Sequence, residues 1–401
     1  METTRRNFLA AAGAVAAGPI ILGGEKKSGT KNPILGEGDH QYECIHDWGE
    51  LPSRIKYGNT HSVAEDSQGH IYIHHTVHKT SESPDAVVVF DHKGKFVRSF
   101  GAMLRGGAHG MHLTKEGKTE YLYFCDEKHG IITKRTMKGE EVWTMGYPQD
   151  SPIYQKGPGS TGPGGAAGLN YRPTNFAIAP NMDFWVGDGY GSYYMFHYSQ
   201  QGHFPKLLNT FGGPPPGQGP AGRGRGGPGA GPGGPPAQAQ GGAPGAVPGG
   251  GRRGGGPPRG PVNAPIDSMN NPHGNMVDLR DPAKPILLVA DRGNRRIVRY
   301  TLDDKPIDIV EGTVQPCHFH ERKGSIVIPD LSGPVTLLDK DNKVIVHMGQ
   351  GPNNPPRTTE DRSKFIPGQF VNPHGAIFDH EGNIFVAEWV EIGRVTKLRK
   401  V

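Results

Sequence analysis

The segments Asn271-Pro-His-Gly-Asn-Met-Val-Asp278 and Ile286-Leu-Leu-Val-Ala-Asp291 decide how this chain folds. Both are short, rich in aliphatic and β-branched residues, and bounded by turn-forming residues, which is typical of two antiparallel strands joined by a turn. A third stretch of the same kind, Arg296–Tyr300, follows them. A fourth, Ile307–Gly312, ends in glycine. Together the four stretches define one repeat unit of four strands.

The same unit occurs six times along the chain, and every copy opens on a polar residue. The opening residues are His61, His109, Asn175, His273, His318 and His374. Four-stranded units that repeat in this way are typical of a β-propeller, in which each unit forms one blade around a central axis. We therefore expect an all-β, six-bladed β-propeller over residues 31–401.

The two ends of the chain complement each other. The sixth unit stops at Val401 without a fourth strand, whereas Tyr42–Gly49 has the glycine-terminated ending of a fourth strand and no unit before it. Pairing between these two segments would close the ring and cover two sheet edges that are otherwise exposed. The sequence thus predicts a propeller closed by an N-terminal outer strand.

The first residues predict export. Thr4-Arg5-Arg6-Asn7-Phe8-Leu9 matches a twin-arginine signature, and an apolar stretch rich in alanine and glycine, Ala10–Gly23, follows it. We interpret residues 1–30 as a signal segment and expect a periplasmic or extracellular protein. Contact with the membrane is expected only through this segment, if it is retained.

The segment Pro214–Pro261 differs in composition from the rest of the chain. It is mostly glycine and proline, with five arginines and no acidic residue, and we expect a disordered insert within the propeller domain. These arginines account for the formal net charge of +5, so the folded body has no positive surplus that would attract nucleic acid. The three cysteines are too scattered for a disulfide framework and are expected to be buried thiols. We expect a monomer.

Histidine opens five of the six units. The first residue of each unit should begin the innermost strand, so these side chains should face the central channel. Neutral imidazole is a common zinc ligand, and a narrow channel could bring several rings together around one ion. The alternative is that the histidines only fill the channel with hydrogen bonds bridged by water.

The motifs around three of these histidines carry a family resemblance. The chain resembles the NHL-repeat propellers, and among them it is similar to the catalytic core of peptidyl-α-hydroxyglycine amidating lyase (peptidylamidoglycolate lyase). The matching motifs are Ala108-His-Gly, Asn271-Pro-His-Gly and Asn372-Pro-His-Gly. The resemblance implies Zn²⁺, or another divalent transition metal, held by His109, His273 and His374 with one position left open. His61 and His318 are further candidate ligands, which the family pattern lacks.

The resemblance also implies two catalytic residues. Tyr190 in Asp188-Gly-Tyr190 corresponds to the family's catalytic tyrosine and would act as a general base. Arg292 in Ala290-Asp-Arg-Gly-Asn corresponds to an active-site arginine that would hold a carboxylate. The chain departs from the family where a second arginine is expected in the first unit, because His74 or His75 stands there. It also has Gly375 where the family has an acidic calcium ligand.

These features predict an exported, metal-dependent lyase that cleaves a carbon–nitrogen or carbon–oxygen bond, or a hydrolase. Its substrate would be a small hydroxylated molecule or a peptide. The alternative is a non-catalytic NHL propeller that binds a protein or glycan at one rim, which requires no metal. An esterase or lactonase propeller normally uses carboxylate ligands, and the ring positions of this chain offer none.

Overall fold

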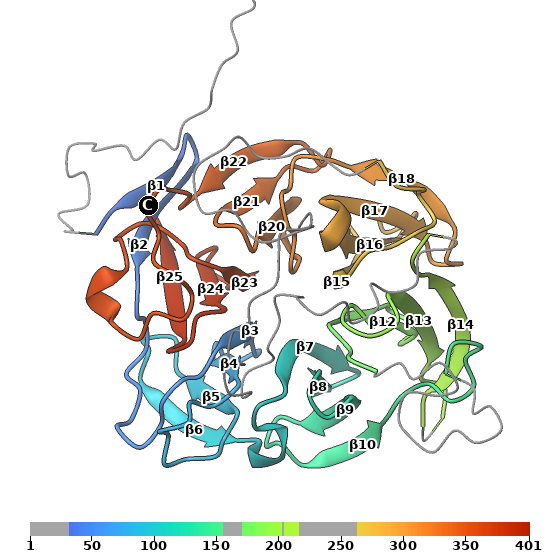
Figure 1. Ribbon diagram of the computed structural model, residues 1–401, viewed down its shortest axis with the longest axis horizontal. Coiled ribbons are helices and arrows are strands. Elements are labelled where there is room, and N and C mark those ends of the chain that lie inside the picture. Colours follow the sequence, from blue (N-terminus) through green and yellow to red (C-terminus); the bar gives the residue numbers. More distant parts are fainter. Residues whose placement is uncertain (1–31, 155–170, 203, 216–262) are drawn as a thin grey trace, which may run out of the picture.

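The computed structural model describes residues 32–154, 171–202, 204–215 and 263–401. Over these residues the strands form six antiparallel sheets arranged around one axis, so the protein is a six-bladed β-propeller, as predicted (Figure 1). The predicted signal segment 1–30 and nearly all of the predicted insert 214–261 lie outside the described residues. In the described ranges, no helix is long and apolar enough to cross a membrane.

Each blade is an up-and-down sheet whose first strand lies nearest the axis. Blade one is β3 (Thr60–Glu65), β4 (Ile71–His75), β5 (Val87–Phe90) and β6 (Phe96–Phe100); blade two is β7 (Ala108–Glu116), β8 (Thr119–Asp126), β9 (Ile131–Thr136) and β10 (Glu141–Met145). Blade three is β11 (Phe176–Ile178), β12 (Phe184–Gly187), β13 (Tyr194–Ser199) and β14 (Lys206–Gly212); blade four is β15 (Pro272–Asp278), β16 (Ile286–Asp291), β17 (Arg296–Thr301) and β18 (Pro306–Val310).

The last two blades complete the ring. Blade five is β19 (His320–Arg322), β20 (Ser325–Pro329), β21 (Val335–Leu338) and β22 (Val344–Met348); blade six is β23 (Pro373–Phe378), β24 (Ile384–Glu388), β25 (Arg394–Lys400), β2 (His40–Ile45) and β1 (Ile34–Glu37). Within the described ranges, three short 3₁₀ helices connect strands: η1 (Ala102–Leu104), η3 (Arg292–Asn294) and η4 (Arg362–Lys364).

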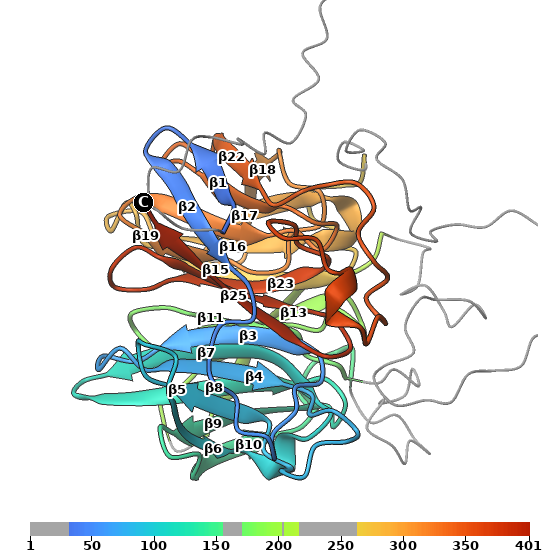
Figure 2. The same cartoon turned by 90° about the vertical axis from the view of Figure 1, so that its left-hand side faces the viewer.

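The N-terminal strand closes the ring as predicted. Strand β2 pairs antiparallel with β25, with Cys44 opposite Leu398, and supplies the missing fourth strand of blade six (Figure 2). The sequence did not predict β1, which pairs with β2 and makes blade six five-stranded. Leu35 of β1 is buried against the same apolar cluster as Tyr42, so β1 covers the outer edge of the closing strand.

Blades pack on one another through strands that are buried on both faces. Between blades one and six, for example, Val63 and Ile73 belong to the same apolar cluster as Ile377 and Phe385. Their β-branched and aromatic side chains fill the space between two sheets that radiate from one axis. The three cysteines, Cys44, Cys125 and Cys317, are free and buried, as expected.

A buried acidic residue ends the second strand in five of the six blades or directly follows it: Asp126, Asp188, Asp291, Asp330 and Glu388. In blades three to six its carboxylate accepts a backbone N–H from the segment that arrives from the preceding blade: Arg172 to Asp188, Asn270 to Asp291, Val314 and Gln315 to Asp330, and Val371 to Glu388. This contact fixes each segment just before the residue that opens the blade.

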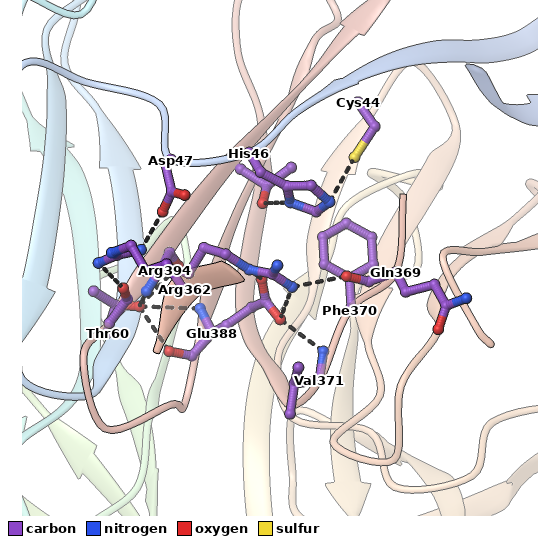
Figure 3. Close-up of polar contacts among 12 residues, drawn as sticks. Cys44, His46, Asp47, Thr60, Arg362, Gln369, Phe370, Val371, Glu388 and Arg394 are labelled. Carbon is purple, nitrogen blue, oxygen red and sulfur yellow. Dashed lines mark hydrogen bonds and ion pairs between the residues drawn. The ribbon is translucent and has the colours of Figure 1, made fainter. Parts of the chain in front are cut away.

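Polar contacts lock the junction of blades six and one (Figure 3). The Thr60 hydroxyl donates to the backbone carbonyl of Glu388 at 2.7 Å across this junction. Arg394 forms a two-point ion pair with Glu388, at 2.5 and 2.9 Å, and also donates to the carbonyl of Gln369. Both partners of the ion pair are almost completely buried.

The burial of the Glu388–Arg394 ion pair predicts that its loss lowers the free energy of unfolding. Arg394→Met keeps most of the side-chain volume but leaves the Glu388 carboxylate buried beside no cation, which should lower the free energy of unfolding by about 3–5 kcal/mol. Arg299→Met is the matched control, because the Arg299–Asp308 pair of blade four is partly exposed and its loss should cost about 0–1 kcal/mol. Urea denaturation of both variants measures the difference. Equal losses in the two variants would contradict this account of the junction.

Candidate metal centre

The structure brings His109, His273 and His374 together on the axis. They lie on β7, β15 and β23, the first strands of blades two, four and six, and all three are buried. Their ring centroids are 4.7 Å apart for His109 and His273 and 4.8 Å apart for each pair with His374. The rings thus form a nearly equilateral triangle, as residues at equivalent positions of alternate blades should.

Each of the three rings is oriented by the next blade. The Nδ1 atoms of His109, His273 and His374 lie 2.6, 2.8 and 3.1 Å from the backbone carbonyls of Thr174, Cys317 and His61. A carbonyl can only accept, so Nδ1 carries the hydrogen and Nε2 carries the lone pair. Burial lowers the pKa of His374 to about 3 and the pKa values of the other two well below the ordinary value, so all three rings are neutral.

The glycine that follows each of these histidines allows this contact. A Cβ at Gly110, Gly274 or Gly375 would collide with the backbone carbonyl of Thr174, Cys317 or His61, which is the carbonyl that the preceding histidine contacts. None of these glycines has a positive φ, so close approach of the backbones, not an unusual conformation, is the requirement. The glycine of the His-Gly motif therefore allows the close backbone approach that orients the imidazole of the preceding histidine.

The hydroxyl of Tyr190 lies between two of the rings. It is 3.3 Å from Nε2 of His109 and 3.2 Å from Nε2 of His273, and it accepts a hydrogen bond from Nη2 of Arg292 at 3.0 Å. Burial raises the pKa of Tyr190, and the Arg292 guanidinium opposes that rise. The structure thus places both predicted catalytic residues at the histidine triangle.

The turn that carries Tyr190 is held rigidly. The buried carboxylate of Asp188 accepts from the Tyr154 hydroxyl, from the backbone N–H of Arg172, and from the hydroxyl and backbone N–H of Ser192. A Cβ at Gly189 would collide with the carbonyl of Pro272, the residue before His273. The Asp-Gly-Tyr sequence thus anchors the turn and lets it approach blade four closely enough to reach the triangle.

The hydrogen bonding of the triangle fits a bound cation. The Nε2 lone pairs of His109 and His273 share the single hydroxyl proton of Tyr190, which can satisfy only one of them at a time. Nε2 of His374 has no hydrogen-bond partner among the described residues. Buried polar atoms are rarely left without partners, and neutral imidazole nitrogens are ligands that zinc and related divalent ions prefer. The donor chemistry of His109, His273 and His374 therefore fits the implied metal, although the two sets whose ligand atoms all lie within 4.8 Å of one another are His61, His109 and His374, and His273, Cys317 and His374.

The two further candidate ligands lie in different surroundings. The ring of His61 is 4.5 Å from that of His374 and 5.3 Å from that of His109, centroid to centroid. His318 instead donates from Nδ1 to the carbonyl of Ala376 at 3.0 Å, and its electrostatic neighbours include His112 and His320. The structure thus groups His61 with His109 and His374, whereas His318 has His112, His320 and His374 as electrostatic neighbours and belongs to neither close set of ligand atoms.

The two histidines that replace the expected first-blade arginine end strand β4. His75 lies opposite Thr60 in the register and accepts the backbone N–H of Val77 at Nδ1. It occupies the position that an acidic residue holds in the other blades. The His74 ring packs 5.0 Å from that of Phe124. Neither residue supplies a cation, because burial lowers both pKa values to about 3.

Sequence reasoning missed Arg172. Its guanidinium lies 5.1 Å from the centre of the Tyr190 ring, compared with 5.4 Å for Arg292, and it pairs with the carboxylate of Glu127. Arg172 is partly exposed, whereas Arg292 is buried. Arg172 belongs to no repeat and follows a Gly/Pro-rich stretch, so the spacing of the repeats gives no sign that it reaches the site.

No protein-family model matches this sequence, and a search of curated proteins found no match. Among solved structures, the chain resembles a catalytically inactive virginiamycin B lyase from Staphylococcus aureus, with 13% identity over 90% of this chain and 100% of that chain, at a TM-score of 0.48. A streptogramin B lyase shows 11% identity over 91% and 99% of the two chains, with a TM-score of 0.48. A luciferin-regenerating enzyme shows 10% identity over 89% and 95%, with a TM-score of 0.45. These likenesses concern the fold, and no activity follows from them.

The His-Gly contact predicts a specific sensitivity to a single methyl group. Gly274→Ala should lower the free energy of unfolding by about 1–3 kcal/mol, because its Cβ forces the first strand of blade four away from Cys317. Gly146→Ala is the control, since a Cβ there meets nothing within 4 Å. Chemical denaturation compares the two variants. If Gly274→Ala were as stable as Gly146→Ala, the blades would not be in the close contact described.

Proposed function

We propose that this protein is a metal-dependent lyase of the peptidylamidoglycolate type, acting on a small substrate that carries a hydroxyl group. The observation that carries the proposal is the position of the Tyr190 hydroxyl, within 3.3 Å of Nε2 of His109 and His273 and 3.0 Å from Arg292. A phenol beside a cluster of metal-type ligands and under a guanidinium suits proton transfer. We propose export by the twin-arginine route as part of the same function, on the strength of residues 4–9.

Each residue of the site would have a separate role in the reaction. His109, His273 and His374 would hold Zn²⁺ or another divalent transition metal, which when bound supplies a Lewis acid that polarises a substrate oxygen. Tyr190 would accept the proton of the substrate hydroxyl. Arg292 donates to the Tyr190 oxygen and favours its deprotonated form, against the effect of burial on the pKa.

The reaction that these groups support is an elimination. On a carbon that bears both a hydroxyl and an amide nitrogen, the hydroxyl proton passes to the Tyr190 oxygen and the O–H electron pair becomes the second bond of a carbonyl group. The carbon–nitrogen bond breaks, and the nitrogen leaves with its electron pair and takes up a proton from Tyr190. Water, oxidant and reductant are not consumed, so the residues present suffice for the proton transfers.

Positive charge around Tyr190 favours a substrate with a carboxylate. Arg292 and Arg172 both place a guanidinium near the tyrosine ring, and guanidinium groups bind carboxylates by paired hydrogen bonds. Nε and Nη2 of Arg172 already bind the carboxylate of Glu127, so a substrate carboxylate would compete with Glu127 for this arginine. Arg172 could replace the first-blade arginine that the family pattern would require, although it comes from the segment before blade three. We therefore favour an α-hydroxylated amide that carries a carboxylate.

The first test of this proposal concerns the metal. The purified protein should hold about one divalent transition metal per chain, and His109→Ala, His273→Ala and His374→Ala should each lose most of it, because three ligands set the affinity. Asn175→Ala is the control at the equivalent position of blade three, where the side chain accepts the backbone N–H of Phe176. Elemental analysis of protein purified without chelator gives the stoichiometry. Full occupancy in any of the three histidine variants would contradict the ligand assignment.

The second test concerns Tyr190. Tyr190→Phe removes one hydroxyl and should lower kcat by about 10²–10⁴-fold while the fold and the metal content are retained. Tyr300→Phe removes a hydroxyl from a buried tyrosine of blade four, which bonds to Ile266, and should leave kcat unchanged. The assay should offer α-hydroxyglycine conjugates first and then other α-hydroxy acids. Turnover by Tyr190→Phe at the wild-type rate would exclude Tyr190 as the base.

A further inference from the structure

His61 is a buried histidine that the three-ligand assignment leaves unused. It opens blade one, only 5% of its surface is exposed, and neither ring nitrogen has a hydrogen-bond partner in the part of the chain that the structure describes. A neutral imidazole has one donor and one acceptor, and leaving a buried polar group unpaired costs about 1–3 kcal/mol. A side chain that served only to fill the channel could avoid this cost by being apolar.

His61 lies close enough to other histidines for one of its ring nitrogens to bind the same ion. One ligand atom each of His61, His109 and His374 lie within 4.8 Å of one another. One ligand atom each of His273, Cys317 and His374 also lie within 4.8 Å of one another. Both sets contain His374. Because Nδ1 of His374 contacts the backbone carbonyl of His61, only its Nε2 can bind an ion. The two sets would therefore share one ion and form one centre.

His61 differs from the other three histidines in how its ring is held. Nδ1 of His109, His273 and His374 each contacts a backbone carbonyl, whereas His61 instead offers its own backbone carbonyl to His374. Second-shell hydrogen bonds of this kind orient a ligand and raise its basicity. The His61 ring is therefore free of the constraint that aims the others, and it can turn toward an ion held by them.

We propose that His61 is a fourth nitrogen ligand of the centre, so that one bound ion takes imidazoles from blades one, two, four and six. This proposal rests on the metal site of the proposed function and refines its ligand set. Four protein ligands close a tetrahedral zinc site, and a catalytic site needs an open position. A centre that keeps such a position with four histidines requires a five- or six-coordinate ion. The bound ion would therefore be five- or six-coordinate, whether it is Zn²⁺ or another divalent transition metal such as Fe²⁺, Co²⁺ or Ni²⁺.

Cobalt provides the test, because tetrahedral Co²⁺ absorbs visible light much more strongly than five- or six-coordinate Co²⁺. The full-length protein stripped of metal is titrated with Co²⁺, and the same titration is made with His61→Phe, which keeps a ring but has no ligand atom. Wild type should give the weak spectrum of a high-coordinate ion. His61→Phe should give a stronger spectrum and bind at least about tenfold more weakly, since even the loss of a second-shell partner costs about 10–100-fold in affinity. His318→Phe is the control and should match wild type, because Nδ1 of His318 is committed to the carbonyl of Ala376 and His318 belongs to neither close set of ligand atoms.

The results distinguish a failure of the fourth ligand, His61, from a failure of the three-histidine metal site. If wild type and His61→Phe bind Co²⁺ with the same affinity and the same spectrum, His61 is not a ligand, while the three-histidine centre of the proposed function stands. A strong, tetrahedral spectrum of the wild-type protein also overturns the high-coordinate centre, and it does so even if the His61 variant fails to fold. If wild type binds no Co²⁺ at all and contains no metal when purified, the proposed function fails with it.

Discussion

The centre of this molecule depends on one hydrogen bond, repeated three times, from a histidine Nδ1 to a backbone carbonyl at the start of the next blade. The bond joins neighbouring blades and at the same time turns Nε2 of the histidine toward the other two rings. The third repeat, from His374 to the carbonyl of His61, crosses the junction where the ring closes. Closure by β2 and the contacts of Thr60, Glu388 and Arg394 are therefore conditions for assembling the histidine triangle, not only for stability.

The sequence predicted the features that depend on the repeat. Strand order, the six blades and the closure by β2 follow from a period that each blade shows separately. The same period placed His109, His273 and His374 at equivalent positions of alternate blades, and the structure shows them as a nearly equilateral triangle. Strand β1 could not be predicted in this way, because it adds a fifth strand to one blade and has no counterpart in the others.

Contacts between segments of different blades could not be predicted from the sequence. Arg172 reaches Tyr190 from the segment before blade three, and nothing in the spacing of the repeats reports that approach. His318 shares the repeat position of the metal-type histidines, yet its Nδ1 bonds to the carbonyl of Ala376 and it belongs to neither close set of ligand atoms. His61 shares the position as well and does join them. Which ring points where is decided by side-chain rotation and by the neighbouring blade, and a one-dimensional pattern records neither.

The charges around the centre restrict what it can bind. The buried carboxylates that end the second strands lie one layer away from the axis, and in blades three to six they accept backbone N–H groups, so they are occupied in holding the segments between blades. The groups that meet at the axis are neutral imidazoles. A divalent ion held only by neutral ligands keeps its full charge, and Arg292 adds another positive charge beside it. In a buried site, such a surplus is best balanced by an anionic ligand, which agrees with the proposed substrate that carries a carboxylate.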